Sequence, residues 1–402
     1  MRIVMVGLDL NPPWVEGIRN NVRLISQNLI KYNYEVSVLT KGSNNQPNVE
    51  FIEGMKYHRI SIGYSDSYLS GVFIFLAKLP IELRKIIKQK GIDTVHSHSV
   101  YPLLGLITGV VSRITGVKSV FTLYSSPYNN RIITSYPKFI NMGLKISKNK
   151  LLIRILSFFL DTIVVTSNSS YVKLISIGIN KNKIKLINIG INLSVFKPLN
   201  EVNSMKSKLN MPDNRKTIFF AGDMSPWKGL DIFIKTLAII SEKRSDILGL
   251  VAEKGTFEYR QKRIQQIDNL ITQNRVDDFI RFIGQYENIS ELYEISDVVV
   301  FPYLSSFSLM DIPLSLLEAM AMGKPVIATK IGAIAEVIEH KKNGILIEPN
   351  NIAVLADAIL YMLGNSEESK IMGNEGSKLI NEKFNIDIII PEWERTYTEK
   401  LH

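Results

Sequence analysis

The feature that most constrains this 402-residue chain is a repeated alternation of short apolar runs with longer amphipathic segments. The apolar runs are rich in Val and Ile, which is typical of strands buried on both faces of a parallel sheet. Strands alternating with helices form right-handed βαβ units, so the pattern predicts an α/β protein with doubly wound sheets. The expected strands are 2–8, 34–40, 93–99, 118–124, 161–167, 184–190, 217–223, 247–253, 279–284, 297–303, 325–330 and 344–349.

The chain is too long for one ordinary core, and the strand–helix pattern is interrupted once. Residues 192–216 are polar, contain two prolines and show no strand pattern. We therefore expect two Rossmann-like domains, 1–195 and 196–382. A segment at 383–402, helical after Pro391, is expected to brace the first domain. Ligands of such sheets bind at the carboxyl ends of the strands, so a cleft between the domains is the expected site.

Composition and charge restrict the class of protein further. The chain has no cysteine, which excludes disulfides and thiolate metal sites and fits a cytoplasmic location. Its first residues read as a buried strand and not as a signal peptide, and no uninterrupted apolar run reaches the ~18 residues of a membrane span. We expect a soluble protein or one bound to a membrane surface.

Charge is spread unevenly along the chain. Residues 1–195 carry a formal charge of +15, and residues 196–402 carry −5. The basic half suggests an anionic partner, either nucleic acid or an anionic membrane, although a solvated basic surface remains an alternative. No basic stripe interleaved with aromatic residues is evident, which disfavours nucleic acid. Residues 141–160 could lie on a membrane as an amphipathic helix or could face the core.

Expected strand ends in the first half supply several candidate residues. Gly17 lies where the first strand gives way to a helix, and a glycine there allows backbone N–H groups to approach an anion. His96 and His98 share one face of a strand, with His98 nearer its end, and Tyr124 ends the following strand. Each of these has an ordinary structural alternative. The histidines lack a visible third ligand, so we predict no metal.

In the second half, Lys228 precedes a helix expected to begin near Gly229. A lysine beside a helix N-terminus can bind phosphate, although the surrounding sequence is not the GxxxxGK[ST] pattern of a P-loop. The stretch SFSLMDIPLSLLEAMAMGKPVIAT then predicts a helix from Pro313 to Gly323 followed by a buried strand. Glu318 lies within this apolar helix, and because a buried unpaired carboxylate is costly, it needs water or a partner such as the hydroxyls of a ribose.

With these motifs the chain resembles the retaining glycosyltransferases of the two-Rossmann-domain B fold, and specifically family 4. The resemblance runs in order through PPWVEGIRN, DTVHSHS, DTIVVTSNSS, IKLINIGINLSVFKP, AGDMSPWKGLD, FIRFIGQYENISELYEISDVVVFP, LLEAMAMGKPVIAT and GAIAEVIEHKKNGILIEP. It implies sugar transfer from a nucleotide sugar, such as a UDP- or GDP-sugar, bound mainly by the second domain. The acceptor would bind to the first domain, and no metal or other cofactor is expected.

The resemblance also implies roles for single residues. Glu318 matches the second acid of the family's Glu-x7-Glu motif, which holds the ribose, and Lys228 matches the lysine that neutralises the diphosphate. Gly17 matches the second of two loop glycines that approach this diphosphate. Donor contacts are further expected at the start of the Glu318 helix, at Leu314 and Ser315. His98 and Tyr124 are the candidates for a catalytic contribution from the first domain.

Four positions depart from the family pattern. Met310 stands where the first acid is expected, with Asp311 beside it as a candidate replacement. Asp223 stands in place of an arginine of the donor site, and Tyr124 replaces a histidine. Glu16 replaces the first loop glycine.

Two readings of these departures remain open. Arg19 or Arg131 could supply the missing positive charge in an active enzyme that acts on a lipid-linked, glycan or other hydroxyl acceptor. The alternative is a non-catalytic relative that binds nucleotide sugars as a partner or sensor module.

Overall fold

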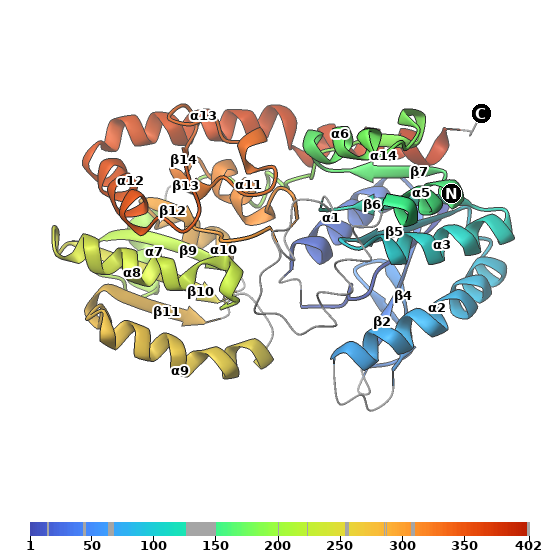
Figure 1. Ribbon diagram of the computed structural model, residues 1–402, viewed down its shortest axis with the longest axis horizontal. Helices are drawn as coiled ribbons and strands as arrows, with labels where there is room; N and C mark the ends of the chain where they lie inside the picture. The colour runs from blue at the N-terminus through green and yellow to red at the C-terminus, as the bar shows by residue number, and fades with distance from the viewer. Residues whose placement is uncertain are drawn as a thin grey trace. The chain divides into compact units, whose positions relative to one another are not determined.

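The computed structural model describes residues 1–13, 16–42, 46–62, 68–125, 150–199, 201–222, 224–253, 257–284, 286, 288–306 and 310–399. The chain forms two compact units (Figure 1). Unit 1 consists of residues 1–190, 308–311 and 386–402, and unit 2 of residues 191–307 and 312–385. Unit 1 thus ends at Gly190 on its first pass, and the chain returns to it twice.

Unit 1 is built on an eight-stranded sheet in the order β3-β4-β2-β1-β5-β6-β7-β8. All neighbours are parallel except β3 and β4, which are antiparallel. The central strand β1 pairs with β2 on one side and β5 on the other, so the strand order reverses direction between β1 and β5. The strands are β1 (Arg2–Val6), β2 (Glu35–Gly42), β3 (Val49–Ile52), β4 (Met55–Ser61), β5 (Thr94–Ser99), β6 (Lys118–Leu123), β7 (Thr162–Val165) and β8 (Ile184–Leu186).

Helices cover both faces of this sheet because alternate residues of each strand face opposite cores. Ile3 and Met5 pack with α1 and α14, whereas Val4 and Val6 pack with α2 and α3. The C-terminal helix α14 therefore belongs to the core of unit 1, which confirms the expected brace. The helices are α1 (Gly17–Lys31), α2 (Tyr68–Lys90), α3 (Pro102–Thr115), α5 (Lys150–Phe159), α6 (Asn168–Ser176) and α14 (Ile386–Thr398).

Unit 2 contains a six-stranded, all-parallel sheet in the order β11-β10-β9-β12-β13-β14. By sequence position this is the 3-2-1-4-5-6 order of a doubly wound nucleotide-binding fold, whose direction reverses between β9 and β12. The strands are β9 (Lys216–Gly222), β10 (Ile247–Glu253), β11 (Ile280–Gly284), β12 (Val298–Phe301), β13 (Val326–Thr329) and β14 (Ile345–Ile347).

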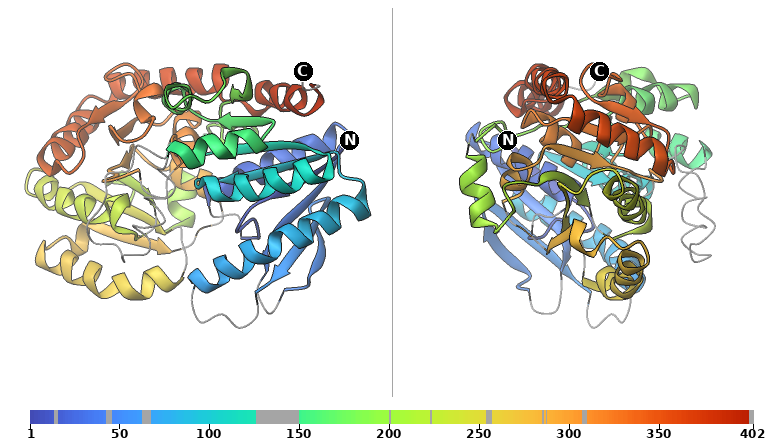
Figure 2. Two further views of the ribbon diagram at one scale, coloured as in Figure 1. Left: turned by 45° about the vertical axis from the view of Figure 1, so that its right-hand side comes forward. Right: turned by 90° about the vertical axis from the view of Figure 1, so that its left-hand side faces the viewer.

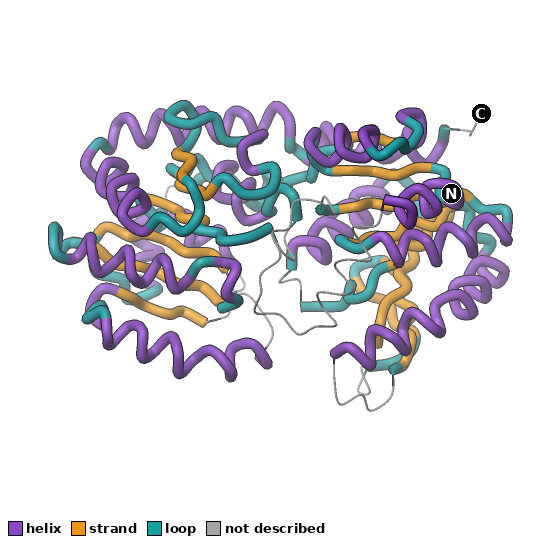
Figure 3. Tube along the Cα trace, in the orientation of Figure 1, coloured by secondary structure: helices purple, strands orange, loops and turns teal. Residues whose placement is uncertain are grey.

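The helices of unit 2 connect and cover these strands (Figures 2 and 3). A continuous apolar cluster links β9, β10 and β12 to α8 and α12. The helices are α7 (Val202–Lys208), α8 (Leu230–Ser241), α9 (Phe257–Gln273), α10 (Ile289–Glu294), α11 (Leu314–Ala321), α12 (Ile352–Gly364) and α13 (Ser366–Lys383). Among the described residues, no helix is both long enough and apolar enough to cross a membrane.

The predicted α/β class with two Rossmann-like sheets is confirmed, and two details differ from the sequence-based expectation. Strands β3 and β4 were not anticipated, because neither is a continuous buried run: β3 alternates exposed with half-buried residues, and β4 mostly alternates buried with half-buried residues. Helix α14 begins at Ile386 and contains Pro391 inside it, so the expectation of a helix only after Pro391 was wrong. Helix α2 also contains a proline, Pro80, inside it.

Candidate functional site

The reversal of strand order in unit 2 brings the loop after β9 beside the end of β12. Gly229 has a left-handed φ of 83°, and a Cβ built there would lie 1.9 Å from the carbonyl oxygen of Pro302, so only glycine fits. The backbone N–H of Leu304 donates to the carbonyl of Trp227 at 2.8 Å. These contacts hold the two loops together at the place where doubly wound folds bind their ligands.

Lys228 lies within this pair of loops, in the short 3-10 helix Pro226–Lys228 that precedes α8. Its side chain is partly exposed, and the ammonium nitrogen lies 4.9 Å from the centre of the Tyr303 ring, within the range of a cation–π contact. Tyr303 itself is fully buried, and its hydroxyl lies 3.4 Å from Oγ of Ser315. Tyr303 thus connects the predicted phosphate-binding lysine to the start of α11.

Glu318 has a partner within the protein. Its side chain is 3% exposed, and one carboxylate oxygen accepts a hydrogen bond from the Tyr293 hydroxyl at 3.1 Å. The same hydroxyl lies 3.1 Å from the carbonyl oxygen of Ser315, one turn earlier in α11. Burial, and next the charge of Glu318, raise the pKa of Tyr293 well above its usual value, so this tyrosine stays a neutral hydrogen-bond donor.

The start of α11 is shaped as the sequence predicts. Pro313 is the N-cap, and Gly323 beyond the helix has a left-handed φ of 69°. Leu314, at 9% exposed, and Ser315 form the first turn, whose backbone N–H groups lie at the positive end of the helix. The structure therefore brings Lys228, Ser315 and Glu318 into one connected group of side chains, through Tyr303 and Tyr293.

Asp311 lies in the short return of the chain to unit 1 and is 1% exposed. One carboxylate oxygen accepts hydrogen bonds from the hydroxyls of Ser167, at 2.6 Å, and Ser170. Its backbone N–H donates to the carbonyl of Tyr124 at 2.7 Å. These contacts give Asp311 a structural role in anchoring the returning segment, next to a Met310 that is 8% exposed.

In unit 1 the loop after β1 leads to α1, with Gly17 as the first helical residue and Glu16 as its N-cap. Arg19 is 7% exposed and donates to the Asp9 carboxylate, and it also donates to the carbonyls of Asn11 and Pro13 at 3.3 Å each. Its guanidinium is thus already used to hold the loop. The prediction that Arg19 replaces a missing donor-site arginine receives no support from this geometry.

His98 and Tyr124 form part of a buried network in unit 1. Nδ1 of His98 lies 3.1 Å from the Tyr124 hydroxyl, to which the Asn21 side-chain amide donates at 2.7 Å. His98 is 2% exposed, so within unit 1 its ring is a buried, hydrogen-bonded group. His96 lies against His98, with ring centres 3.8 Å apart.

The two histidines are buried in their neutral forms. Burial lowers the pKa of His98 to about 3, and burial followed by the proximity of His98 lowers the pKa of His96. The two ring nitrogens of His96 lie 2.7 Å from the hydroxyls of Tyr397, on α14, and Thr122. The network therefore joins α14 to the centre of the sheet. His96 thus has the structural role that was one of its two expected alternatives.

Asp223 and Arg131 lie outside the described residues, so their predicted roles stay predictions. No group of three or more His, Cys, Asp or Glu side chains within the described ranges is placed to hold a metal ion. The sequence reasoning missed Tyr293 and Tyr303. For Tyr303 a signal existed, because it ends the expected strand 297–303, and ligands of such sheets bind at the carboxyl ends of the strands.

Two family models match the chain, one over each half. The model for glycosyltransferase family 4 matches residues 15–195, and the model for glycosyl transferases group 1 matches residues 201–379. The chain therefore belongs to the glycosyltransferases of the group 1 and family 4 type. One relative of this glycosyltransferase is the N-acetyl-alpha-D-glucosaminyl L-malate synthase of Bacillus anthracis, which is 27% identical over 203 residues. That match covers 50% of this chain and 50% of the relative, so it spans about half of the relative's length.

Solved structures show the same fold over the whole length. A sucrose-phosphate synthase from Thermosynechococcus elongatus superposes with a TM-score of 0.81, covering 98% of both chains at 21% identity. The Anabaena protein HepE, solved in complex with UDP and glucose, has a TM-score of 0.78 and covers 99% of both chains at 17% identity. These similarities establish the two-Rossmann-domain B fold.

Proposed function

We propose that this glycosyltransferase uses a nucleotide sugar as donor and transfers the sugar with retention of its anomeric configuration. The observation that carries the proposal is the connected group of Lys228, Ser315 and Glu318 in unit 2, located where the strand order reverses. The complex of the Anabaena protein with UDP and glucose supports a nucleotide donor for this fold.

Each residue of this group suits one part of a nucleotide sugar. Lys228 is a partly exposed cation that can neutralise charge on the diphosphate as the bond to the sugar breaks. The first-turn N–H groups of α11 favour the same anion. The Glu318 carboxylate, which has several acceptor positions, can accept hydroxyls of the ribose in addition to the Tyr293 hydroxyl. In this proposal the leaving diphosphate is stabilised by protein groups without a metal.

For the acceptor we propose a hydroxyl of a glycan or lipid-linked molecule in glycoconjugate or polysaccharide synthesis, bound by unit 1. Several large apolar side chains are exposed on its outer helices, namely Phe73 and Ile81 on α2, Ile114 on α3 and Phe158 on α5. Together these helices carry eight Lys and Arg and a single acid, Glu82. Exposed apolar residues among cations suit peripheral contact with an anionic membrane, which would present such an acceptor.

The donor is tested first by thermal shift with a panel of UDP-, GDP- and other nucleotide sugars, because a ligand of the folded state raises the melting temperature. We expect one nucleotide class to stabilise the wild type and to lose this effect in Glu318→Gln. Glu382→Gln, an exposed acid on α13, is the control. Unchanged stabilisation in Glu318→Gln would contradict the site.

Retention and transfer need a second measurement. With the stabilising donor and a hydroxyl acceptor, NMR of the product gives the anomeric configuration directly. Inverted product would overturn the retaining mechanism. Tight nucleotide binding without transfer or donor hydrolysis would favour the alternative of a non-catalytic sensor, for which the methionine at position 310 is the supporting observation.

A further inference from the structure

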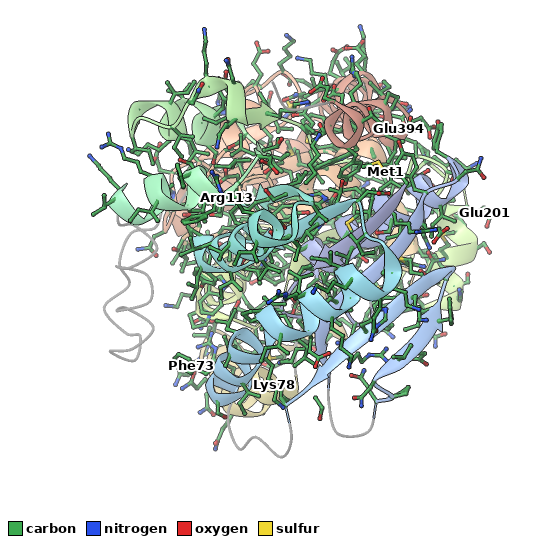
Figure 4. The ribbon with its side chains drawn as sticks, turned by 90° about the vertical axis from the view of Figure 1, so that its right-hand side faces the viewer. Met1, Phe73, Lys78, Arg113, Glu201 and Glu394 are labelled. Atoms are coloured by element: carbon green, nitrogen blue, oxygen red, sulfur yellow. The ribbon has the colours of Figure 1, made fainter. Side chains whose placement is uncertain are left out.

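A pocket of about 570 Å³ lies in unit 1 between strand β4 and helix α2, away from every residue assigned to the donor. Lys56, His58 and Ile60 alternate along β4 and therefore point to the same face of the sheet. Ile60 packs with the apolar face of α2, which places the polar side chains of β4 beside the polar edge of that helix. Figure 4 shows α2 in front of these strands, with Lys78 labelled.

The lining of this pocket is strongly basic. Lys78, Lys85 and Lys90 from α2 join Lys56 from β4, and among the described residues of the lining the one acid is Glu82, whose carboxylate lies 3.9 Å from Lys85. Arg59 also lines the pocket, but it is 2.7 Å from Glu50 and is already paired. The four lysines and Glu82 leave a net excess of positive charge.

Two cations of the pocket approach each other without an intervening acid. Direct contact with the Lys90 ammonium, and next its charge, lower the pKa of Lys56. No carboxylate of the described residues lies within ion-pair distance of Lys56 or Lys90. Like charges held together in this way disfavour the folded state unless an anion joins them.

His58 supplies the second, independent observation. Its Nε2 is inaccessible to solvent and has no hydrogen-bond partner among the described atoms. A buried polar atom without a partner is uncommon in folded proteins and often marks a missing ligand or water. The same ring lines the pocket through its other atoms, so a hydrogen-bond acceptor bound there reaches Nε2 when the ring rotates about its Cβ–Cγ bond.

We propose that this pocket binds a phosphate group carried as a phosphate ester. A phosphate offers oxygens to Lys56, Lys90 and the His58 ring together, and its charge offsets the excess of lysines. The phosphate could belong to a soluble phosphorylated molecule or to a phospholipid headgroup. Ile81, which is 70% exposed at the edge of the pocket, would suit the headgroup, since apolar atoms adjoin its phosphate. This site does not rest on the proposed transfer reaction.

The test uses inorganic pyrophosphate as probe, in the full chain carrying Lys228→Ala so that the donor site does not contribute. The variant Lys56→Gln/Lys90→Gln removes two charges from the pocket. Lys370→Gln/Lys378→Gln removes two exposed lysines from α13 and is the matched control. By calorimetry we expect the pocket variant to bind at least fivefold more weakly and the control to bind as the parent does.

The imidazole NMR signals of His58 report binding in the pocket itself, which a general change in the charge of the protein would not reproduce. We expect them to shift on addition of pyrophosphate, and a His58→Gln variant with a wild-type circular dichroism spectrum to bind more weakly. The second arm uses vesicles of phosphatidylcholine with and without phosphatidylglycerol. Loss of binding to the phosphatidylglycerol vesicles in Lys56→Gln/Lys90→Gln, but not in the control, identifies a lipid headgroup as the source.

Equal binding of pyrophosphate and of vesicles by parent and pocket variant, or no binding of either by the parent, would overturn the proposal. Neither result bears on donor use, which is measured separately with Lys228 intact. The pocket variant is expected to retain the thermal shift caused by the stabilising nucleotide sugar. A failure of the phosphate pocket can therefore be told apart from a failure of the proposed function.

Discussion

The two units share a doubly wound topology but use the reversal of strand order differently. In unit 1, His98 of β5 forms with Tyr124 a buried, neutral network. In unit 2, the loop after β9, which also borders the reversal, carries Lys228, a partly exposed cation, and Tyr303 and Ser315 connect it to the helix of the buried carboxylate Glu318. The same backbone plan thus builds a stabilising polar core in one unit and a group suited to an anionic ligand in the other. Fold similarity alone would not have distinguished them.

Removing the Lys228 cation of unit 2 is the strongest test of the difference between the two units. We expect Lys228→Ala to lower turnover about 100- to 1,000-fold, because it removes a charge that stabilises the leaving diphosphate. Lys235→Ala, an exposed lysine on α8, should have no such effect. The measurement is single-turnover transfer with the stabilising donor. Equal rates for the two variants would show that the cation of unit 2 has no catalytic use.

Glu318→Gln tests the carboxylate of the same group. A hydrogen bond to a charged acceptor contributes about 1.5–3 kcal/mol, so nucleotide affinity should fall about 10- to 100-fold. The amide keeps the size of the side chain, and its oxygen can still accept from Tyr293. Calorimetric titration with the free nucleotide measures the loss. Full affinity in a folded Glu318→Gln protein would show that the Glu318 carboxylate does not bind the ribose.

The network of unit 1 predicts a loss of stability in acid. The pKa values of His96 and His98 are lowered in the folded state, so their stabilising contribution is complete above the unfolded value of about 6.5. It is lost as the pH falls toward the folded values, about 3 for His98, at up to about 1.4 kcal/mol per pH unit for each histidine. Urea unfolding at pH 7.5, 6.0 and 5.0 measures this slope.

The control for this slope is His98→Asn, which removes one of the two titrating groups. It should flatten the dependence on pH even if it lowers stability at pH 7.5. An unchanged slope in that variant would assign the acid sensitivity to other groups and would leave the network of unit 1 without the predicted consequence.

The smallest effect is expected from Tyr293→Phe, because Tyr293 positions Glu318 and is not assigned a contact with the donor. Loss of the hydroxyl that Tyr293 donates to Glu318 should raise KM for the donor about three- to tenfold and leave kcat nearly unchanged. Tyr361→Phe, on α12, is the control for loss of a tyrosine hydroxyl. A fall in kcat with constant KM would instead place Tyr293 in the chemical step.

The predictability of the site from sequence differed between its parts. Lys228, Glu318 and the start of α11 follow from short local patterns, namely a strand end, a Pro–Gly frame and an acid within an apolar helix. Tyr293 contacts Glu318 from 25 residues upstream, so no local pattern could assign the pair. The use of Asp311 by Ser167 and Ser170 joins residues more than 140 positions apart.

The sequence by itself determined the two α/β units and most strand positions, because buried parallel strands require continuous apolar runs. It also determined the places of Lys228 and Glu318 relative to their helices. The tertiary structure alone decided which polar groups are buried as neutral partners and which remain charged. Burial and hydrogen bonding depend on what distant strands and helices place around a side chain. In this protein they bury His98 within the core of unit 1 and place the Tyr293 hydroxyl against the Glu318 carboxylate.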